Sequence, residues 1–131
     1  MGIDYAARAR ALVGTRFRAQ GRGEGGLDCI GVVVRTFAIP REAVRSDYRL
    51  RGAGHLRVLR DALDQHFRRV PRTQLRSGDV MLLAAAPQQP HLAIRTPDGF
   101  VHAHAGVRRV VETPGDPEWP LLAVYRKRRR G

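Results

Sequence analysis

Cysteine is almost absent from this sequence, because Cys29 is the only one among 131 residues. A single cysteine excludes an intramolecular disulfide, so any special role of Cys29 must be that of a thiol. The first residues lack the uninterrupted apolar core of a secretory signal peptide, and no stretch approaches the length of a membrane span. The sequence therefore predicts a chain that is made without a signal peptide and has no membrane span.

Acidic residues and lysine are also scarce. The sequence has 12 acidic and 24 basic residues, a net charge of +12, and Lys127 is its only lysine. This excess should attract polyanions, but the basic residues are scattered and match no nucleic-acid-binding motif. A nucleic acid is therefore not expected as a specific ligand. We interpret residues 1–125 as a single domain, and the basic run from Arg126 to Arg130 as part of a solvated tail over residues 126–131.

Helical periodicity dominates the first half of the sequence. Asp4 is placed to cap a helix that ends at Gly14, and Asp28 to cap a second one with a strongly apolar stripe. Pro40 is expected to stop this second helix, because proline cannot continue the hydrogen-bond ladder. A third helix is predicted near residues 55–67, where leucines recur on one face.

The second half has the pattern of short strands. The predicted strands are residues 79–84, 91–95, 100–104, 108–112 and 121–125. The gaps between them are short and contain turn residues, which favours an antiparallel meander. Helices first and strands second predict an α+β fold.

Cys29 is predicted to lie in the first turn of the helix capped by Asp28, directly after a glycine-rich loop over residues 15–27. The backbone N–H groups and the dipole at a helix N-terminus favour negative charge, which lowers the pKa of a thiol below its usual ~8.5. The glycine loop should leave the sulfur open to a substrate. A small, buried apolar residue is the alternative interpretation of a lone cysteine, and position alone does not decide between the two.

The histidines favour the catalytic interpretation. His91 opens one predicted strand and His102 lies on the next, so the hairpin between them should bring the two side by side. A cysteine nucleophile needs a histidine base and a third polar residue that orients the base. His104 points to the same side of its strand as His102 and is the alternative third residue. Together with Cys29 these histidines could instead bind zinc, although the usual paired ligand spacing is absent.

Three blocks of the sequence resemble motifs of the NlpC-type family of bacterial cell-wall endopeptidases, which are papain-like cysteine peptidases. Residues 14–34 (GTRFRAQGRGEGGLDCIGVVV) resemble its nucleophile motif, residues 75–82 (LRSGDVML) its Gly-Asp-hydrophobic strand, and residues 91–103 (HLAIRTPDGFVHA) its histidine strand, turn and closing His-Ala. The variant Asp-Cys-Ile-Gly, with no serine after the cysteine, looks most like the phage-tail and gene-transfer-agent branch of the family.

The resemblance implies a papain-like fold, in which the nucleophile helix packs on a C-terminal antiparallel sheet and neither cofactor nor metal is needed. Matched motif by motif, Cys29 corresponds to the nucleophile, His91 to the general base and His102 to the residue that orients it. We expect Cys29 and His91 to form a thiolate–imidazolium pair at neutral pH.

The chain departs from the family pattern at two positions near the expected oxyanion pocket. Phe17 stands where many members have a tyrosine, whose hydroxyl is thought to help stabilise the oxyanion, and Gln20 stands where glycine is common. Gln20 could itself donate a hydrogen bond there. Asp28 completes the predicted pocket and is interpreted as a helix cap rather than a catalytic acid.

The function implied by the resemblance is hydrolysis of an amide bond in a peptidoglycan stem peptide, typically between D-glutamate and diaminopimelate. Members of the branch it resembles are carried by a tail structure, so phage-tail or gene-transfer-particle proteins are expected partners. Such a chain would be made in the bacterial cytoplasm and act in the periplasm or cell wall. The alternative is a catalytically weak protein of the same fold that caps or plugs a tail tip, which the loss of a hydroxyl at Phe17 favours.

Overall fold

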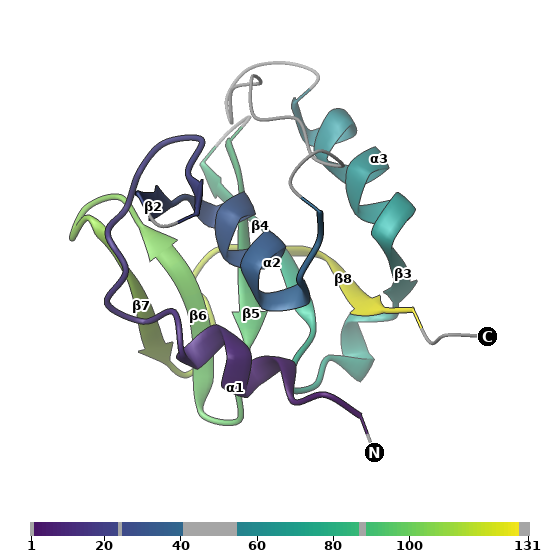
Figure 1. The fold of residues 1–131 in the computed structure, drawn as a ribbon. Coiled ribbons are helices and arrows are strands. Elements are labelled where there is room, and N and C mark those ends of the chain that lie inside the picture. Colours follow the sequence, from purple (N-terminus) through teal and green to yellow (C-terminus); the bar gives the residue numbers. More distant parts are fainter. Residues whose placement is uncertain (1, 24, 41–54, 87–88, 129–131) are drawn as a thin grey trace.

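The three α-helices precede most of the strands along the chain in this computed structural model, which describes residues 2–23, 25–40, 55–86 and 89–128 (Figure 1). The helices are α1 (Tyr5–Arg10), α2 (Cys29–Phe37), α3 (His55–His66) and a short 3-10 helix, η2 (Arg72–Gln74). The strands are β1 (Arg22–Gly23), β2 (Gly26–Leu27), β3 (Phe67–Val70), β4 (Val80–Ala86), β5 (Gln89–Arg95), β6 (Gly99–His104), β7 (Arg109–Pro114) and β8 (Leu121–Lys127). Within the part of the chain that the structure describes, no helix has the length and hydrophobicity needed to cross a bilayer.

The first two helices begin where their cap residues predict. An Asp4 side-chain oxygen accepts a hydrogen bond from the backbone N–H of Ala7 at 3.0 Å, which satisfies one of the N–H groups at the start of α1. The end of α2 differs from the prediction. Ala38 adopts a left-handed conformation (φ 53°) and its N–H bonds to the Val34 carbonyl, so the helix ends before Pro40 is reached.

The sheet has the order β3-β8-β4-β5-β6-β7 and its paired strands are antiparallel. Strands β4 to β7 form the expected meander. The expectation fails for β8, which returns to pair with β4 and lies between β4 and β3. Strand β3, which follows α3 without a gap, was not predicted. The sheet therefore gains two strands on the side away from β7.

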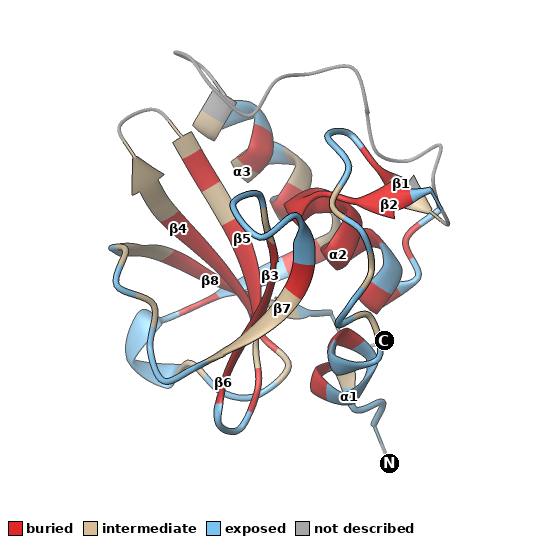
Figure 2. Ribbon diagram, turned by 90° about the vertical axis from the view of Figure 1, so that its left-hand side faces the viewer, coloured by how far each residue is buried: buried red, intermediate tan, exposed pale blue. Residues whose placement is uncertain are grey.

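Each face of the sheet buries its own apolar cluster, because side chains alternate along every strand. Val80, Leu82 and Ile94 point towards the helices and pack with the apolar stripe of α2, while Met81 and Leu83 belong to a cluster on the opposite face. In Figure 1, α1 and α2 lie in front of the sheet, and Figure 2 shows that α2 and the central strands are the most buried parts. Helix α2 is thus packed against the sheet, as the family resemblance implied.

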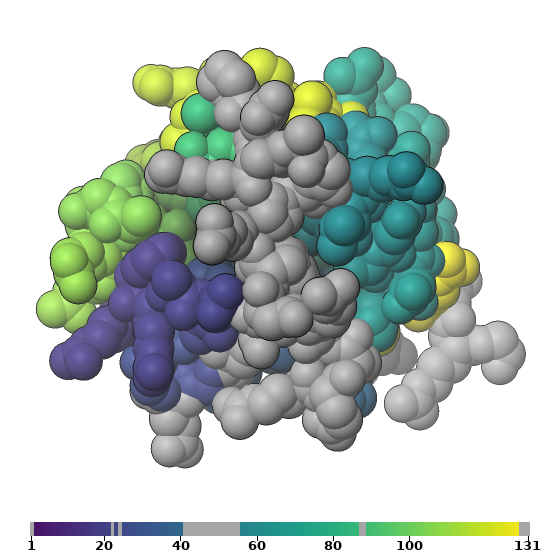
Figure 3. All heavy atoms as spheres, turned by 90° about the horizontal axis from the view of Figure 1, so that it is seen from above, coloured from purple at the N-terminus to yellow at the C-terminus, as the bar shows by residue number. Residues whose placement is uncertain are grey.

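The loop before α2 is anchored to the connection between β6 and β7. The N–H of Gly14 donates to the Val110 carbonyl and the N–H of Phe17 to the Arg108 carbonyl, both at 2.9 Å. Figure 3, seen from above, shows this purple segment against the light-green β6–β7 end of the sheet. The anchoring carries Phe17 to the N-terminal end of α2.

The glycine loop lies so close to α2 that only glycine fits at one helical position. A Cβ on Gly31 would collide with the carbonyl oxygen of Gly21. The glycine that follows the Cys-Ile pair therefore lets the loop backbone approach the helix next to Cys29.

The basic end of the chain begins later than the sequence suggested. Strand β8 continues through Lys127, which pairs with Phe67 of β3. The predicted domain boundary after residue 125 is therefore too early, because Arg126 and Lys127 belong to the sheet. Residues 129–131 of the predicted tail lie outside the described residues.

Candidate active site

A cavity of about 250 Å³ lies at the N-terminus of α2. Its lining includes Phe17, Asp28, Cys29, His91, His102 and Trp119. The walls thus come from the loop before α2, from α2 itself, from β5 and β6, and from the segment that leads into β8. The cavity brings together all three predicted catalytic side chains, from parts of the sequence up to 73 residues apart.

Cys29 is the first residue of α2 and only 3% exposed, at the wall of this cavity. Asp28 caps the helix, since its Oδ1 accepts a hydrogen bond from the N–H of Gly31 at 2.8 Å. The predicted cap is therefore confirmed. The sulfur belongs to the positive end of a nine-residue helix, where a thiolate is favoured by the helix dipole.

Gln20 takes part in the site through its backbone. Its N–H donates to Oδ2 of Asp28 at 2.9 Å, so one carboxylate holds both the loop and the helix. Gln20 has φ 60°, a left-handed conformation that explains why glycine suits this position. Gln20 is absent from the described residues that line the cavity, so its role in the pocket stays a prediction.

The two predicted partners of Cys29 touch each other directly. His91 Nε2 and His102 Nδ1 are 2.9 Å apart, and the two rings meet edge to face at 83°. Strands β5 and β6 are paired only next to their turn, at Ile94 with Val101 and Arg95 with Phe100. The two histidines lie beyond this short ladder, His91 on β5 and His102 on β6.

His104 is engaged elsewhere. Its Nδ1 lies 3.0 Å from the N–H of Gly106 and 3.2 Å from that of Val107, so this nitrogen accepts from the β6–β7 turn. His102, and not His104, is therefore the residue in hydrogen-bond contact with His91. These bonds also disfavour the zinc alternative, and the described residues contain no group of three His, Cys, Asp or Glu arranged to hold a metal ion.

Burial keeps both histidines of the pair neutral. It lowers the pKa of His91 to about 3, with a smaller contribution from His102 and His104, and the pKa of His102 to about 4, with a smaller contribution from His104. A neutral imidazole can accept a proton from Cys29, as a general base must. The expected thiolate–imidazolium pair requires a protonated His91 at neutral pH, and it stays a prediction.

Two residues of the site were not predicted from the sequence. Trp119 stacks edge-on against both histidines, with ring centroids 5.3 Å from His91 and 5.9 Å from His102. The hydroxyl of Thr113 on β7 lies 3.2 Å from His102 Nε2. Trp119 is the only tryptophan of the chain, a signal that could have drawn attention to it; Thr113 offers no such local signal.

Comparison with known proteins links this chain to enzymes of the bacterial cell wall. No protein-family profile matches it. It is 30% identical over 109 residues to the murein DD-endopeptidase and LD-carboxypeptidase MepS of Escherichia coli K12, which amounts to 81% of this chain. The chain spans about half, 51%, of the length of that relative.

Solved structures show the same fold. NlpC1 from Trichomonas vaginalis superposes with a TM-score of 0.69 at 16% identity, over 94% of this chain and 42% of that one. RipD from Mycobacterium tuberculosis, described as a non-catalytic NlpC/p60 domain protein adapted to peptidoglycan binding, gives 0.56 at 16% identity, over 94% of each chain. None of these three proteins is described as a phage-tail component, so tail association stays a prediction. The expected fold is confirmed, because the chain has the fold of these NlpC/p60 proteins, and its sequence is similar to that of MepS.

Proposed function

We propose that this protein is a cysteine peptidase that hydrolyses an amide bond in the peptide part of peptidoglycan. The observation that carries the proposal is the contact between His91 Nε2 and His102 Nδ1 at 2.9 Å, in the wall of the cavity that Cys29 also lines. Support for the substrate comes from the similarity to MepS, a murein endopeptidase.

The reaction starts with a neutral base. His91 Nδ1 takes the proton of the Cys29 thiol as the sulfur attacks the peptide carbonyl, and then gives that proton to the leaving amine. His102 holds the imidazole of His91 in place through Nε2 and takes no proton itself. Water, activated by the same histidine, then releases the acyl group from the sulfur. The positive end of α2 favours the charge that develops next to Cys29.

Phe17 limits how well this site can stabilise an oxyanion. It lines the cavity but has no hydroxyl to donate. The loss of one oxyanion donor can cost about 3 kcal/mol of transition-state stabilisation. We therefore expect a slow enzyme, and we expect Phe17→Tyr to raise kcat if the new hydroxyl reaches the carbonyl oxygen.

Digestion of purified peptidoglycan, followed by mass spectrometry of the soluble fragments, tests the proposal. The wild type should release fragments, whereas Cys29→Ala and His91→Ala should release none and His102→Ala should release fewer. His66→Ala is the matched control, because His66 lies on α3 and is absent from the described cavity lining. Equal release by wild type and Cys29→Ala would refute a cysteine mechanism.

The fragment masses also identify the scissile bond. From the motif resemblance we propose cleavage between D-glutamate and diaminopimelate, which splits the stem peptide itself. MepS is named for D,D-endopeptidase and L,D-carboxypeptidase activities instead. Loss of cross-links, or of a terminal residue alone, would assign this chain the MepS specificities and overturn the proposed bond.

A non-catalytic wall-binding protein is the second candidate. Phe17 in place of a tyrosine favours it, and RipD shows that a protein of this fold can be non-catalytic. Co-sedimentation with intact peptidoglycan separates the two candidates. Binding by the wild type and by Cys29→Ala, with no fragment released by either, would support this second function.

The place of action is also a proposal. The Asp-Cys-Ile-Gly motif supports an origin in a phage tail or gene-transfer particle that acts on the cell wall. Mass spectrometry of purified particles from the source organism tests this: the chain should copurify with tail proteins. Its recovery only from the particle-free fraction would overturn tail association and leave the peptidase proposal intact.

A further inference from the structure

His102 forms hydrogen bonds through both of its ring nitrogens. Nδ1 lies 2.9 Å from His91 Nε2, and Nε2 lies 3.2 Å from Oγ1 of Thr113. The side chain is only 2% exposed, and burial lowers its pKa to about 4, so the ring is neutral near pH 7 and carries one proton. One of its nitrogens must therefore donate while the other accepts.

The chemistry at Cys29 decides which nitrogen donates. For His91 to take the thiol proton at Nδ1, its own proton must sit on Nε2 and be donated to Nδ1 of His102. The single proton of His102 then has to be on Nε2, where the hydroxyl oxygen of Thr113 accepts it. In the opposite arrangement Nδ1 of His91 carries the proton and cannot accept another.

Thr113 is placed to accept this proton of His102. It sits on β7 opposite Phe100, which makes it the diagonal neighbour of His102 on the same face of the sheet. It lines a second cavity, of about 240 Å³, that shares His102 and Trp119 with the first one. Thr113 is absent from the described lining of the cavity that holds Cys29, so it acts on the reaction through His102.

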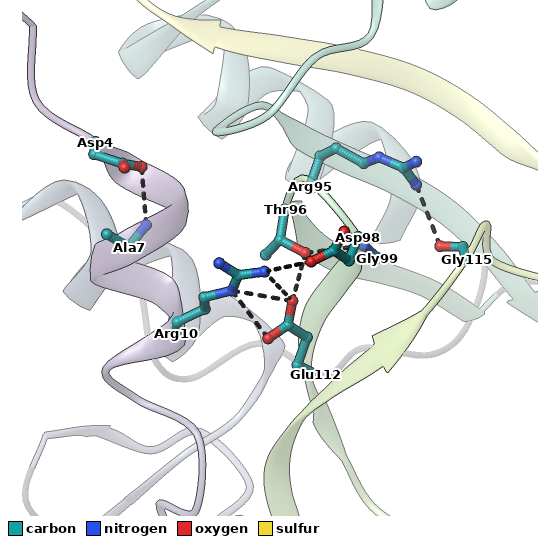
Figure 4. Close-up of polar contacts among 9 residues, drawn as sticks. All are labelled: Asp4, Ala7, Arg10, Arg95, Thr96, Asp98, Gly99, Glu112 and Gly115. Carbon is teal, nitrogen blue, oxygen red and sulfur yellow. Dashed lines mark hydrogen bonds and ion pairs between the residues drawn. The ribbon is translucent and has the colours of Figure 1, made fainter.

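The strand that carries Thr113 is held in register next to this residue. Glu112 forms a two-point ion pair with Arg10 of α1, with Oε1 3.0 Å from Nε and Oε2 3.0 Å from Nη2. Its Oε2 also accepts from the hydroxyl of Thr96 at 2.6 Å (Figure 4). β7 is the edge strand of the described sheet and pairs with β6 alone. The contacts of Glu112 with Arg10 and Thr96 therefore help to hold the part of β7 that carries Thr113.

We propose that Thr113 is a positioning residue of the active site, whose hydroxyl accepts from His102 Nε2 and so supports the arrangement in which His91 can accept the Cys29 proton. The inference rests on the proposed peptidase function. No proton moves to Thr113: the thiol proton goes to His91 Nδ1 and from there to the leaving amine, while the bonds from His91 to His102 and from His102 to Thr113 keep their protons.

Thr113→Val and Thr113→Ser test the proposal as a pair. Valine has nearly the shape of threonine but no acceptor, whereas serine keeps the hydroxyl. We expect Thr113→Val to lower kcat roughly 10- to 100-fold with little change in KM, because it leaves the buried Nε2 of His102 without its hydrogen-bond partner. Thr113→Ser should recover most of the loss. Thr73→Val, on the exposed helix η2, is the control.

A spectroscopic measurement tests the tautomer without any substrate. In 15N-detected spectra of labelled protein at pH 7, His102 should be protonated on Nε2 in the wild type and in Thr113→Ser, and show a larger share of the Nδ1-protonated form in Thr113→Val. An Nδ1-protonated His102 in the wild type, or equal tautomers and equal kcat in Thr113→Val and wild type, would overturn the proposal. If the wild type proves inactive, the proposed function fails, and the spectra alone decide the role of Thr113. If Thr113→Val does not fold, Thr113→Ala replaces it.

Discussion

Arg126 and Asp79 form a two-point ion pair that joins the end of β8 to the start of β4. Arg126 Nε lies 2.7 Å from Oδ1 and Nη2 lies 2.7 Å from Oδ2, and the carboxylate is only 2% exposed. The carboxylate raises the pKa of Arg126 through these hydrogen bonds. Asp79 also accepts the N–H of Arg76, so its buried charge is matched by donors on two sides. An arginine that looks like part of a solvated tail in the sequence is therefore a structural residue.

Arg126→Ala should destabilise the protein by about 1–3 kcal/mol, because it leaves the buried carboxylate of Asp79 without its cation. Partial exposure of the arginine keeps the loss below that of a fully buried pair. Chemical denaturation measures the change. Lys127→Ala is the matched control, since Lys127 is exposed on the same strand. Equal stability of the two variants would contradict the structural role of Arg126.

The contact between Arg126 and Asp79 could not be predicted from the sequence. A run of basic residues predicts a solvated end, and nothing local reveals that Arg126 meets a carboxylate 47 positions earlier in the chain. The place of β8 was missed for a similar reason. Its apolar residues predict a strand, but only long-range packing decides that it pairs with β4 and not with β7.

Local sequence patterns predicted the position of Cys29 correctly. Asp28 and the apolar stripe behind it predicted the start of α2 and the position of Cys29 on its first turn, because caps and periodicity are properties of neighbouring residues. Thr113 was not predictable in this way. Its contact with His102 depends on the register between β6 and β7, which places it diagonally across the sheet.

Asp28→Ala should affect both stability and activity. It removes the cap bond to Gly31 and the tether to Gln20 in one step. Loss of a cap costs about 1 kcal/mol, and the glycine loop is no longer held against the helix that carries Cys29. We expect a lower melting temperature together with a fall in kcat. Asp4→Ala, which removes the cap of α1, is the control and should lower stability alone. If kcat is equally reduced in both variants, the tether has no specific role.

Gln20→Gly should stabilise the protein slightly without loss of activity. The left-handed backbone of Gln20, with φ 60°, costs an ordinary residue about 1 kcal/mol that glycine does not incur. The bond to Asp28 comes from the backbone N–H, so the substitution preserves it. The net gain in stability should not exceed about 1 kcal/mol, because glycine also increases the entropy of the unfolded chain. A clear loss of kcat would show that the Gln20 side chain acts in the reaction after all.

The protonation of His91 distinguishes a neutral Cys29–His91 pair from a thiolate–imidazolium pair. With pKa values lowered by burial to about 3 for His91 and about 4 for His102, both rings should stay neutral from pH 7 to about pH 5. NMR titration of labelled histidines checks this directly. Midpoints near or above 6.5 for His91, and their loss in Cys29→Ala, would instead establish the thiolate–imidazolium pair.

The same low pKa values make stability fall towards acid. The unfolded chain takes up histidine protons below about pH 6.5, whereas the folded protein does so only near the lowered pKa values, so the unfolded state binds more protons in this window. The contribution of these two histidines to the free energy of unfolding is thus fully present above about pH 6.5. It declines as the pH falls towards 4 and 3. The loss is at most about 2 kcal/mol for each histidine between pH 7 and pH 5. Denaturation curves at several pH values should show this slope in the wild type and about half of it in His102→Asn. If His102→Asn shows the same dependence of unfolding free energy on pH as the wild type, His102 takes up no proton on unfolding. Its burial then does not hold it neutral.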